Sequence, residues 1–358
     1  MKIKFLKAFN GDAILLSFKE GSEPRNILID GGTPATYLQK NEVGEIIYGL
    51  LKKTVDQIRK RGEIIDLLIL THVDDDHIGG ILKWVENDQY AANLIGKVWF
   101  NSGRLISEYF KKEEIKENLI DLHFANIFAR SIGQGVKFED YIENNRIWDR
   151  RIIKSGDQIP LLGLNFNILS PSEEKLKILL KKWKKEKPDS LKMKGSANDY
   201  SLTLTQHIEK DKFVEDNAEH NGSSIAMVIG NQDKKLVFLA DAHPQIIVDS
   251  LKKLGYSAEK PLKAEFVKIS HHGSKLNNSV EMLKMIKTKK YIISTNGDYH
   301  SHPHKQFLGR LASVNKDCKI YFNYPEQIAE IFSAQDFTDF PKFKPTSVKD
   351  NQVTVSKI

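Results

Sequence analysis

Several features are scarce in this sequence, and each shortage excludes a class of protein. Cys318 is the single cysteine among 358 residues, which rules out an internal disulfide and a thiolate metal cluster. No uninterrupted apolar run approaches the length of a membrane-spanning helix. The opening residues, MKIKFLKAFNGDAILLSF, lack the small-residue cleavage site of a secretory signal. We therefore expect a cytoplasmic protein with no membrane partner.

Two common catalytic motifs are missing as well. Neither GDAILL nor IGGIL has the glycine pattern of a nucleotide-binding loop. HHGS lacks the flanking glycines of a serine nucleophile elbow, so Ser274 is not expected to act as a nucleophile. With one cysteine in the chain, a metal site must be built from imidazole and carboxylate groups.

Positive charge, by contrast, is in excess. The formal net charge is +7 and the pI is near 9.0, which favours an anionic partner, most commonly nucleic acid. Residues 173–195 carry many lysines around apolar residues that include Trp183. One interpretation is a solvated amphipathic helix followed by a loop, and the other is a basic flap that contacts phosphates with Trp183 available for stacking.

The pattern of apolar residues predicts sheets with helices outside them. Short apolar runs ending in turn residues are typical of strands, and apolar residues at helical spacing indicate helices. Strands are expected at 3–9, 13–18, 26–30, 64–70, 97–102, 199–208, 223–230, 234–241, 264–270 and 290–298, a hairpin at 157–171, and helices at 43–61, 78–88 and between 241 and 260.

Histidines gather at the expected strand ends. Eight of the eleven lie there: His72, His77, His243, His271, His272, His300, His302 and His304. In THVDDDHIGG, His72 and Asp74 alternate and so point to one side, while Asp76 and His77 begin a helix and can turn back toward the same point. One aspartate could instead cap the helix. Five ionisable groups beside a buried strand are better explained by a bound cation.

The motifs resemble those of a known family. His72-x-Asp74-x-Asp76-His77 resembles the H-x-H-x-D-H motif of the metallo-β-lactamase superfamily, with Asp74 in place of the second histidine. NGDAILLSF…ILIDGG and LVFLAD are similar to the family's first hairpin and to its strand bearing a metal-bridging aspartate. VKISHHGSK and IISTNGDYHSHP resemble the ComEC/Rec2-like hydrolase branch, and the likeness spans roughly residues 1–312.

The resemblance implies an α/β fold, a four-layer αββα sandwich in which two facing mixed β-sheets have helices outside. It implies a single metallo-β-lactamase-like hydrolase domain over residues 1–340. A lysine-rich insertion at 173–195 and a loop at 209–222 are expected within it, and a C-terminal tail at 341–358.

The resemblance also implies a set of metal ligands. His72 and Asp74 would bind one metal, Asp76 and His77 the other, with Asp241 bridging them. His271 would complete the second site. Three further residues, His272, Asp30 and Asp12, are expected to support these ligands or to replace one of them.

A third histidine that the family usually supplies has no clear counterpart, since Ser170 stands at the comparable strand end. His243 could compensate, and His220 is a weaker candidate. One or two divalent ions are expected, Zn²⁺ or Mn²⁺, with Mg²⁺ also compatible, because Asp74 hardens the ligand set.

Such a site suits hydrolysis of a phosphodiester in DNA or RNA through a metal-activated hydroxide. In this hypothesis Asp76 positions the water, and His302 or His243 protonates the leaving oxygen. Three residues, Ser274, Lys275 and Asn221, are expected to hold phosphate oxygens.

Two alternatives stay open. One is hydrolysis of a small-molecule phosphodiester, lactone or thioester. The other is a degenerate member of the family that binds nucleic acid or a partner protein without catalysis, and the missing histidine motivates it. The sequence leaves the oligomeric state undetermined.

Overall fold

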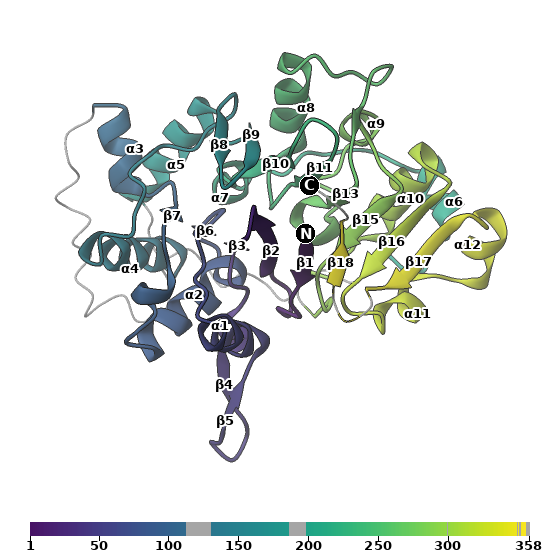
Figure 1. Ribbon diagram of the computed structural model, residues 1–358. Coiled ribbons are helices and arrows are strands. Elements are labelled where there is room, and N and C mark those ends of the chain that lie inside the picture. Colours follow the sequence, from purple (N-terminus) through teal and green to yellow (C-terminus); the bar gives the residue numbers. More distant parts are fainter. Residues whose placement is uncertain (112–129, 186–197, 299, 349, 351, 356–358) are drawn as a thin grey trace.

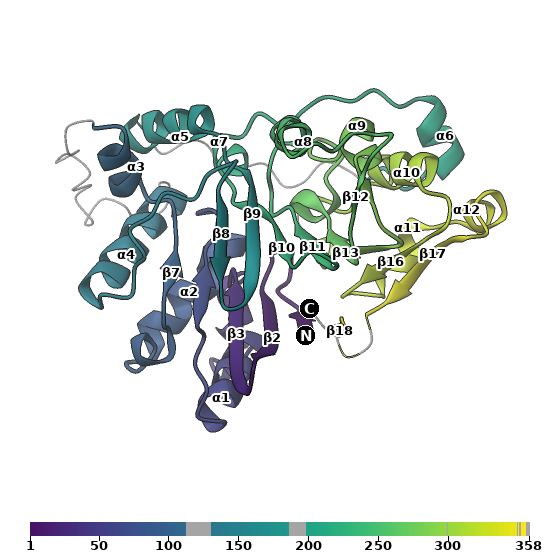
Figure 2. The ribbon, with the colours of Figure 1, turned by 45° about the horizontal axis from the view of Figure 1, so that its top comes forward.

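Two mixed β-sheets face each other, and helices cover both of their outer faces (Figures 1 and 2). The computed structural model describes residues 1–111, 130–185, 198–298, 300–348, 350 and 352–355. The expected four-layer αββα sandwich is confirmed.

The first sheet has six strands in the order β18-β1-β2-β3-β6-β7. β1, β2 and β3 form an antiparallel meander, and β3, β6 and β7 run parallel. The strands are β1 (Lys2–Phe5), β2 (Ile14–Glu20), β3 (Glu23–Ile29), β6 (Leu67–Ile69), β7 (Val98–Trp99) and β18 (Gln352–Thr354).

The second sheet has eight strands in the order β17-β16-β15-β13-β11-β10-β9-β8. The strands from β11 to β17 run parallel, and β8, β9 and β10 are antiparallel. They are β8 (Gln158–Leu161), β9 (Leu164–Ser170), β10 (Ala226–Gly230), β11 (Lys235–Phe238), β13 (Phe266–Lys268), β15 (Lys290–Ile293), β16 (Cys318–Phe322) and β17 (Phe343–Ser347). Two small pairs lie outside these sheets: β4 (Leu38–Lys40) with β5 (Ile46–Tyr48), and β12 (Leu262–Lys263) with β14 (Ile286–Lys287).

Alternating side chains of the two sheets form the interior of the sandwich. Ile3 and Phe5 of β1 meet Phe266 of β13, and Trp99 of β7 meets Phe166 of β9. The opposite side chains of the same strands face the helices, as Leu68 does on β6 and Val267 on β13. This two-residue alternation is what the apolar runs of the sequence predict.

The helices fall into two groups. Over the first sheet lie α1 (Leu50–Lys60), α2 (Asp75–Asn87), α3 (Gly103–Tyr109), α4 (Arg130–Asn144) and α5 (Glu173–Lys185). Over the second lie α6 (Leu204–Glu209), α8 (Pro244–Lys253), α9 (Val280–Lys284), α10 (Lys305–Val314), α11 (Gln327–Ile331) and α12 (Ala334–Asp339). The short α7 (Glu219–Gly222) precedes β10.

The lysine-rich α5 is an amphipathic helix within the described residues. Leu176, Leu179, Leu180 and Trp183 are buried in the core over the first sheet. The ring of Trp183 lies against Gly103 and Gly135. Trp183 is therefore not available for stacking, and the solvated amphipathic helix is the correct interpretation for residues 173–185. The remainder of the insertion, 186–195, lies outside the described residues.

Three segments differ from their sequence-based expectation. Residues 199–208 do not form a strand: Thr203 and Gln206 make a capping box that starts α6. The helix expected at 43–61 begins only at Leu50, because β4 and β5 form a hairpin that projects beside α1 (Figure 1). The segment 341–358, expected as a tail, contributes β17 and β18, one to each sheet.

The topology places several loops at one edge of the sandwich. The parallel strands β3, β6, β11, β13 and β15 each end there, and β10, antiparallel to β11, begins there. Within the described part of the chain, none of the helices has the length and apolar character required to span a membrane.

Candidate metal centre

The opening motif lies in the turn between β6 and α2. Asp74 is the N-cap of α2 with an extended backbone, and its side chain does not cap the helix. Asp75 accepts a hydrogen bond from Gln134 Nε2 at 2.6 Å and faces α4. The capping interpretation therefore does not account for Asp74, and Asp75 is turned toward a neighbouring helix.

Asp30, at the end of β3, holds this turn in place. Its Oδ1 accepts from the backbone N–H of Thr71 at 2.8 Å, and its Oδ2 accepts from Thr71 Oγ1 and His77 Nδ1, both at 2.7 Å. Thr71 Oγ1 in turn lies 3.0 Å from His72 Nδ1. One carboxylate thus fixes the ring orientation of two histidines, directly and through a hydroxyl, leaving both Nε2 atoms to face inward.

The turn at residues 10–12 approaches the start of α2 very closely. A Cβ on Gly11 would lie 1.8 Å from the carbonyl oxygen of Asp76, so only glycine fits. Asn10 Nδ2 donates to Asp76 Oδ2 at 3.0 Å, and the backbone N–H of Asp12 donates to the Asp76 carbonyl at 3.2 Å. This contact orients the Asp76 carboxylate.

His271 and His272 follow β13 in a tight turn, where both adopt positive φ values, 46° and 52°. His272 Nδ1 donates to the carbonyl of Ser294 at 2.8 Å. His271 Nδ1 lies 2.9 Å from Asn277 Oδ1. As in His72 and His77, the Nδ1 atoms are held from outside and the Nε2 atoms point inward.

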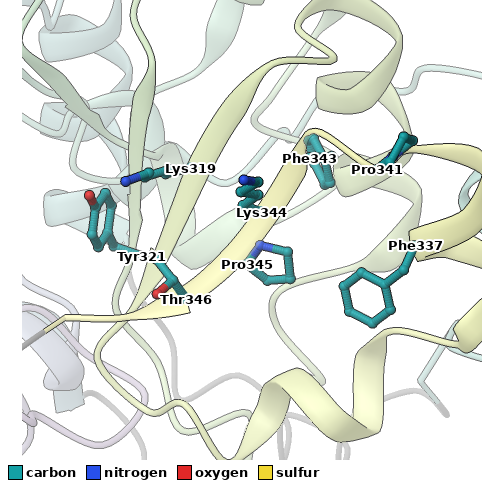
Figure 3. A pocket seen from close by; sticks show the side chains of 8 residues that line it. All are labelled: Lys319, Tyr321, Phe337, Pro341, Phe343, Lys344, Pro345 and Thr346. Atoms are coloured by element: carbon teal, nitrogen blue, oxygen red, sulfur yellow. The ribbon is translucent and has the colours of Figure 1, made fainter.

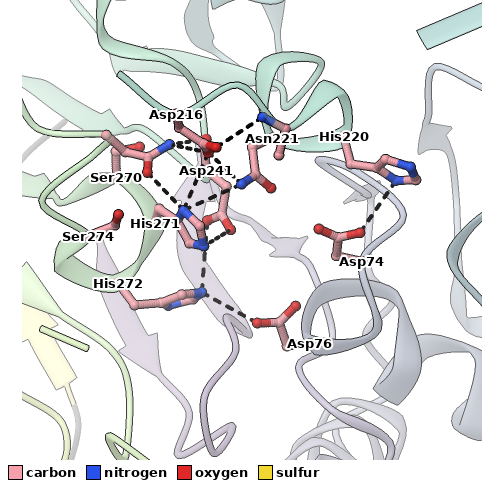
Figure 4. A network of polar contacts seen from close by, with 12 residues as sticks. Asp74, Asp76, Asp216, His220, Asn221, Asp241, Ser270, His271, His272 and Ser274 are labelled. Atoms are coloured by element: carbon pink, nitrogen blue, oxygen red, sulfur yellow. Dashed lines mark hydrogen bonds and ion pairs between the residues drawn. The ribbon is translucent and has the colours of Figure 1, made fainter. Parts of the chain in front are cut away.

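Asp241, just after β11, is the centre on which these rings converge. Figure 4 shows Asp241 with His271, His272 and Asp76 around it. Its Oδ2 lies 3.5 Å from His77 Nε2, 3.6 Å from His271 Nε2 and 3.7 Å from His72 Nε2. Its Oδ1 lies 3.8 Å from His272 Nε2, which is also 3.8 Å from Asp76 Oδ2. Residues from three separate strand ends, those of β6, β11 and β13, therefore lie close together.

His220 of α7 joins the group on the side of Asp74. Its Nδ1 lies 3.4 Å from Asp74 Oδ1, while Asp74 Oδ2 lies 3.7 Å from His72 Nε2. His72, Asp74 and His220 thus stand together at one end of the cluster, and Asp76, His77 and His272 at the other, with Asp241 between. The histidine that lies beside Asp74 is therefore one that sequence reasoning ranked low.

The donor set fits a divalent cation. The Nε2 atoms of His72, His77 and His272 and the Oδ1 atom of Asp241 are buried without a hydrogen-bond partner among the described residues. Buried polar atoms of this kind are rarely left unsatisfied. Ligand atoms of Asp12, His77, Asp241 and His272 lie within 4.8 Å of one another. Imidazole and carboxylate groups in this arrangement suit Zn²⁺ or Mn²⁺.

Electrostatics prepare several of these groups to act as ligands. Burial lowers the pKa of His72 and of His272 to about 4, so both rings are neutral at pH 7. Burial would also lower the pKa of His77, but Asp241 and Asp30 outweigh it and hold that pKa well above its usual value. Burial raises the pKa of Asp76 to about 6. Burial would raise the pKa of Asp241 too, but His271, His77 and His272 hold it well below its usual range.

Asp12 supports the site from behind. It forms a buried ion pair with Lys268, Nζ to Oδ2 at 2.7 Å, and its Oδ1 lies 3.7 Å from His272 Nδ1. Burial alone would raise the pKa of Asp12, but Lys268, His272 and His77 lower it. Sequence reasoning missed Lys268, which neutralises one oxygen of Asp12.

A second supporting network surrounds Asp216, which sequence reasoning did not select. Asp216 Oδ2 accepts from Asn221 Nδ2 at 2.6 Å and from Asn277 Nδ2 at 2.9 Å, and lies 3.7 Å from His271 Nδ1. Burial would raise the pKa of Asp216, but Asn221 and His271 keep it below its usual value. The loop 209–222 therefore delivers both His220 and the residue that orients the surroundings of His271.

The predicted acid–base residues occupy different surroundings. His302 is buried beside the cluster, with its ring centroid 4.9 Å from that of His271. His243 contacts the supporting network instead: its Nε2 lies 3.1 Å from the Ala218 carbonyl and 3.7 Å from Asp216 Oδ2, and its Nδ1 lies 3.1 Å from Lys175 Nζ. Of the two, His302 adjoins the convergent rings.

The three residues predicted to contact phosphate differ in their access to solvent. Ser274 is buried and its Oγ accepts from the backbone N–H of Leu276. Asn221 is buried and donates to Asp216. Lys275 is half-buried, so it is the one of the three with access to solvent.

Comparison with known families bears on these residues directly. Residues 8–139 match the model of the Metallo-beta-lactamase superfamily, a segment that includes Asp12, Asp30 and the whole of the opening motif. The matched segment ends before Asp241 and the later histidines, which the fold brings close to it.

A curated relative extends the similarity further along the chain. ComE operon protein 3 of Bacillus subtilis (strain 168) is 26% identical over 286 residues, which is 77% of this chain and 27% of that protein. The chain thus spans about a quarter of the length of this relative. The resemblance to the ComEC/Rec2-like branch of the metallo-beta-lactamase superfamily is confirmed.

Two solved structures align over 97% of this chain with low similarity. The metallo-beta-lactamase fold protein YhfI from Bacillus subtilis has 11% identity and a TM-score of 0.39, with 95% of its chain covered. A protein of unknown function from Enterococcus faecalis V583 has 9% identity and a TM-score of 0.33, with 76% of its chain covered.

Proposed function

We propose that this chain is a metal-dependent phosphodiesterase that cleaves DNA or RNA. The observation that carries the proposal is the convergence of four imidazole Nε2 atoms on the Asp241 carboxylate, with Asp74 and Asp76 at either end. The ligands we assign are His72, Asp74 and His220 for one ion, Asp76, His77 and His272 for the other, and Asp241 between them. This assignment gives His272 the position that the sequence favoured for His271.

A bound divalent cation would supply an activated water and would stabilise negative charge on a phosphoryl oxygen. The protein's own residues do the rest. Asp76, with a pKa of about 6, is mostly ionised at pH 7 and can accept a hydrogen bond from the attacking water. Asn10 fixes the direction of that carboxylate.

The leaving oxygen carries developing negative charge, and we assign its stabilisation to His302. Burial lowers the pKa of His302 well below its usual value, so its ring is neutral at pH 7 and can donate a ring N–H hydrogen bond to that oxygen. This residue adjoins His271, whereas both ring nitrogens of His243 already have neighbours on α5 and α7. Lys275 is the predicted phosphate contact with access to solvent. Ser274 and Asn221 are buried and would instead line the site behind Lys275.

Three observations favour a nucleic acid over a small molecule. The net charge is +7, and polyanion binding draws on such an excess. Asp74 in place of an imidazole suits ions used in phosphoryl chemistry. The similarity to ComE operon protein 3 agrees with the branch for which we expect a phosphodiester substrate. A cytoplasmic location stays a prediction from the sequence.

The test uses metal-stripped protein incubated with single- and double-stranded DNA and RNA, adding Mn²⁺, Mg²⁺ or Zn²⁺ separately. We expect cleavage with at least one ion and its loss in the Asp76→Ala, His77→Ala variant. Asp249→Asn, on the exposed side of α8, is the matched control and should cleave normally.

Other outcomes would decide against the proposal. If every nucleic acid stays intact while bis(p-nitrophenyl) phosphate is hydrolysed, the substrate is a small phosphodiester. If the protein retains no metal and cleaves neither, it is the non-catalytic family member that the sequence left open.

A further inference from the structure

The two sheets differ in width, and part of the wider one is uncovered. The first sheet ends at β18, whose Val353 shares the sandwich core with Ile292 of β15. β16 and β17 extend the second sheet beyond that edge. Lys319 of β16 and Lys344 of β17 point from the inward-facing side of these strands and are exposed, so no layer formed by the described residues covers them.

Lysines form a row across this uncovered face. Lys290, Lys319 and Lys344 are direct neighbours on β15, β16 and β17. Neighbouring strands lie about 4.8 Å apart, so three like charges stand side by side. Like charges directly opposite each other on adjacent strands are destabilising. Among the described residues, none of these three lysines forms an ion pair that offsets the repulsion.

The nearest acidic group is already engaged. Asp317 pairs with Lys289 at 2.8 Å. That hydrogen bond, with the charges of Lys342 and Lys344, lowers the pKa of Asp317. The excess positive charge of this edge therefore faces solvent.

Aromatic and hydroxyl groups follow the lysines toward the strand ends. Tyr321 and Thr346 are paired neighbours on the same face, two residues further along β16 and β17. A groove of about 650 Å³ at this edge is lined by Lys319, Tyr321, Lys344 and Thr346, with Phe337 and Pro341 from the α12 region beside them (Figure 3). Phe337 is 44% exposed.

We propose that this edge is a second contact surface for a single-stranded nucleic acid, separate from the metal centre. The lysine row would contact successive phosphates, and the exposed Phe337 would stack with bases. Its strands run toward the metal centre, because the carboxyl ends of β11, β13 and β15 carry the candidate ligands and their neighbours. The identity of the polyanion rests on the proposed function, whereas the surface itself rests on the lysine row and the groove.

The experiment measures equilibrium binding of a fluorescein-labelled single-stranded oligonucleotide by anisotropy, with EDTA present so that no cleavage occurs. The variant is Lys319→Gln with Lys344→Gln. The matched control is Lys53→Gln with Lys60→Gln, two exposed lysines of α1. We expect the first pair to weaken binding about tenfold and to reduce the slope of log affinity against log salt by about 1.4, two contacts at about 0.7 each. The control should change affinity less than about twofold.

Three results would overturn the proposal. Both pairs could weaken binding equally, which would indicate a general charge effect. The first pair could leave oligonucleotide binding unchanged. It could also weaken binding to phosphatidylserine vesicles alone, which would indicate a lipid surface.

Cleavage by the same variants separates this inference from the proposed function. Lysine-dependent binding without cleavage in any metal would remove the nuclease assignment and leave the surface. Cleavage together with binding that does not depend on these lysines would support the nuclease assignment and remove the second contact surface.

Discussion

The positions of Asp241 and His220 both follow from the pairing of the two strands that they flank, β11 and β10. Asp241 stands at the end of β11, and β10 runs antiparallel to β11. The residues that precede β10 therefore lie at the same edge as those that follow β11. His220 reaches Asp74 for this reason, although it is far from the opening motif in the sequence.

Removing His220 should weaken metal binding. We expect His220→Ala to lower affinity for the more weakly held ion by at least tenfold, because even residues that only support a ligand contribute about 10–100-fold. The measurement is competition with a chromogenic chelator. His243→Ala is the comparison and should bind metal within about twofold of wild type, since His243 faces Ala218 and Lys175. A larger loss in His243→Ala than in His220→Ala would reverse the assignment.

The clustering of the opening motif was predictable because its residues are contiguous and follow a clear apolar strand. His72, Asp74 and His77 need only local geometry to come together. That they bind metal stays a prediction. His220 and Asp216 depend on the path of a polar loop, which periodicity does not reveal. The available signal was the hairpin itself: a histidine shortly before β10 mirrors an aspartate shortly after β11.

A buried ion pair joins helices that cover the second sheet. Lys305 at the start of α10 pairs with Asp336 of α12 at 2.7 Å, and both side chains are 1% exposed. Asp336 Oδ1 also accepts from the backbone N–H of Leu204 at the start of α6. One carboxylate therefore connects three helices.

Asp336→Asn should destabilise the protein at neutral pH by about 3–5 kcal/mol, because it leaves Lys305 buried without its partner. Burial would raise the pKa of Asp336, but its bond with Lys305 lowers it below 3.8. A lowered pKa stabilises the fold above the unfolded value, and this contribution is lost as pH falls through the folded value. Urea unfolding at several pH values should show the difference from wild type shrinking below about pH 4. Asp317→Asn, in an exposed pair, should differ little at any pH. An undiminished difference at acidic pH would contradict this account.

The bounds of helices and strands were predictable where the apolar residues of a segment followed a single period, that of a strand or that of a helix. The strands on either side of the metal centre are short apolar runs and appear as expected. Residues 199–208 mislead because L-T-L-T alternates like a strand, yet Thr203 and Gln206 carry a capping-box pattern that outweighs the alternation. In the segment 43–61, exposed Ile46 and Ile47 belong to a hairpin rather than to an apolar helix face.

At the scale of the whole molecule, the two sheets depend on residues late in the chain. β18 pairs with β1, so the first and last described strands close the edge of one sheet. Val353 and Val355 are buried in the core between the sheets. The fold class was predictable from the ordered motifs, whereas the pairing of β18 was not, since QVT is too short to be distinguished from a loop.

Truncation after Ser347 should therefore reduce stability. Losing three buried valines, Val348, Val353 and Val355, removes about 4.5–9 kcal/mol at about 1.5–3 kcal/mol each, and β1 loses a strand partner. The midpoint of urea denaturation should fall clearly relative to full-length protein. A chain ending at Val355 is the matched control and should unfold like the full chain. Equal midpoints for the two truncations would show that β18 contributes nothing.

The unsatisfied nitrogens around Asp241 have a thermodynamic consequence for the folded state. A cation that binds the assembled cluster and not the unfolded chain adds RT ln(1 + [M]/Kd) to the free energy of unfolding, about 2.7 kcal/mol at one hundred times Kd. The sandwich and the ion are then linked equilibria. The fraction of chains that are folded would rise and fall with the free concentration of the metal that the site selects.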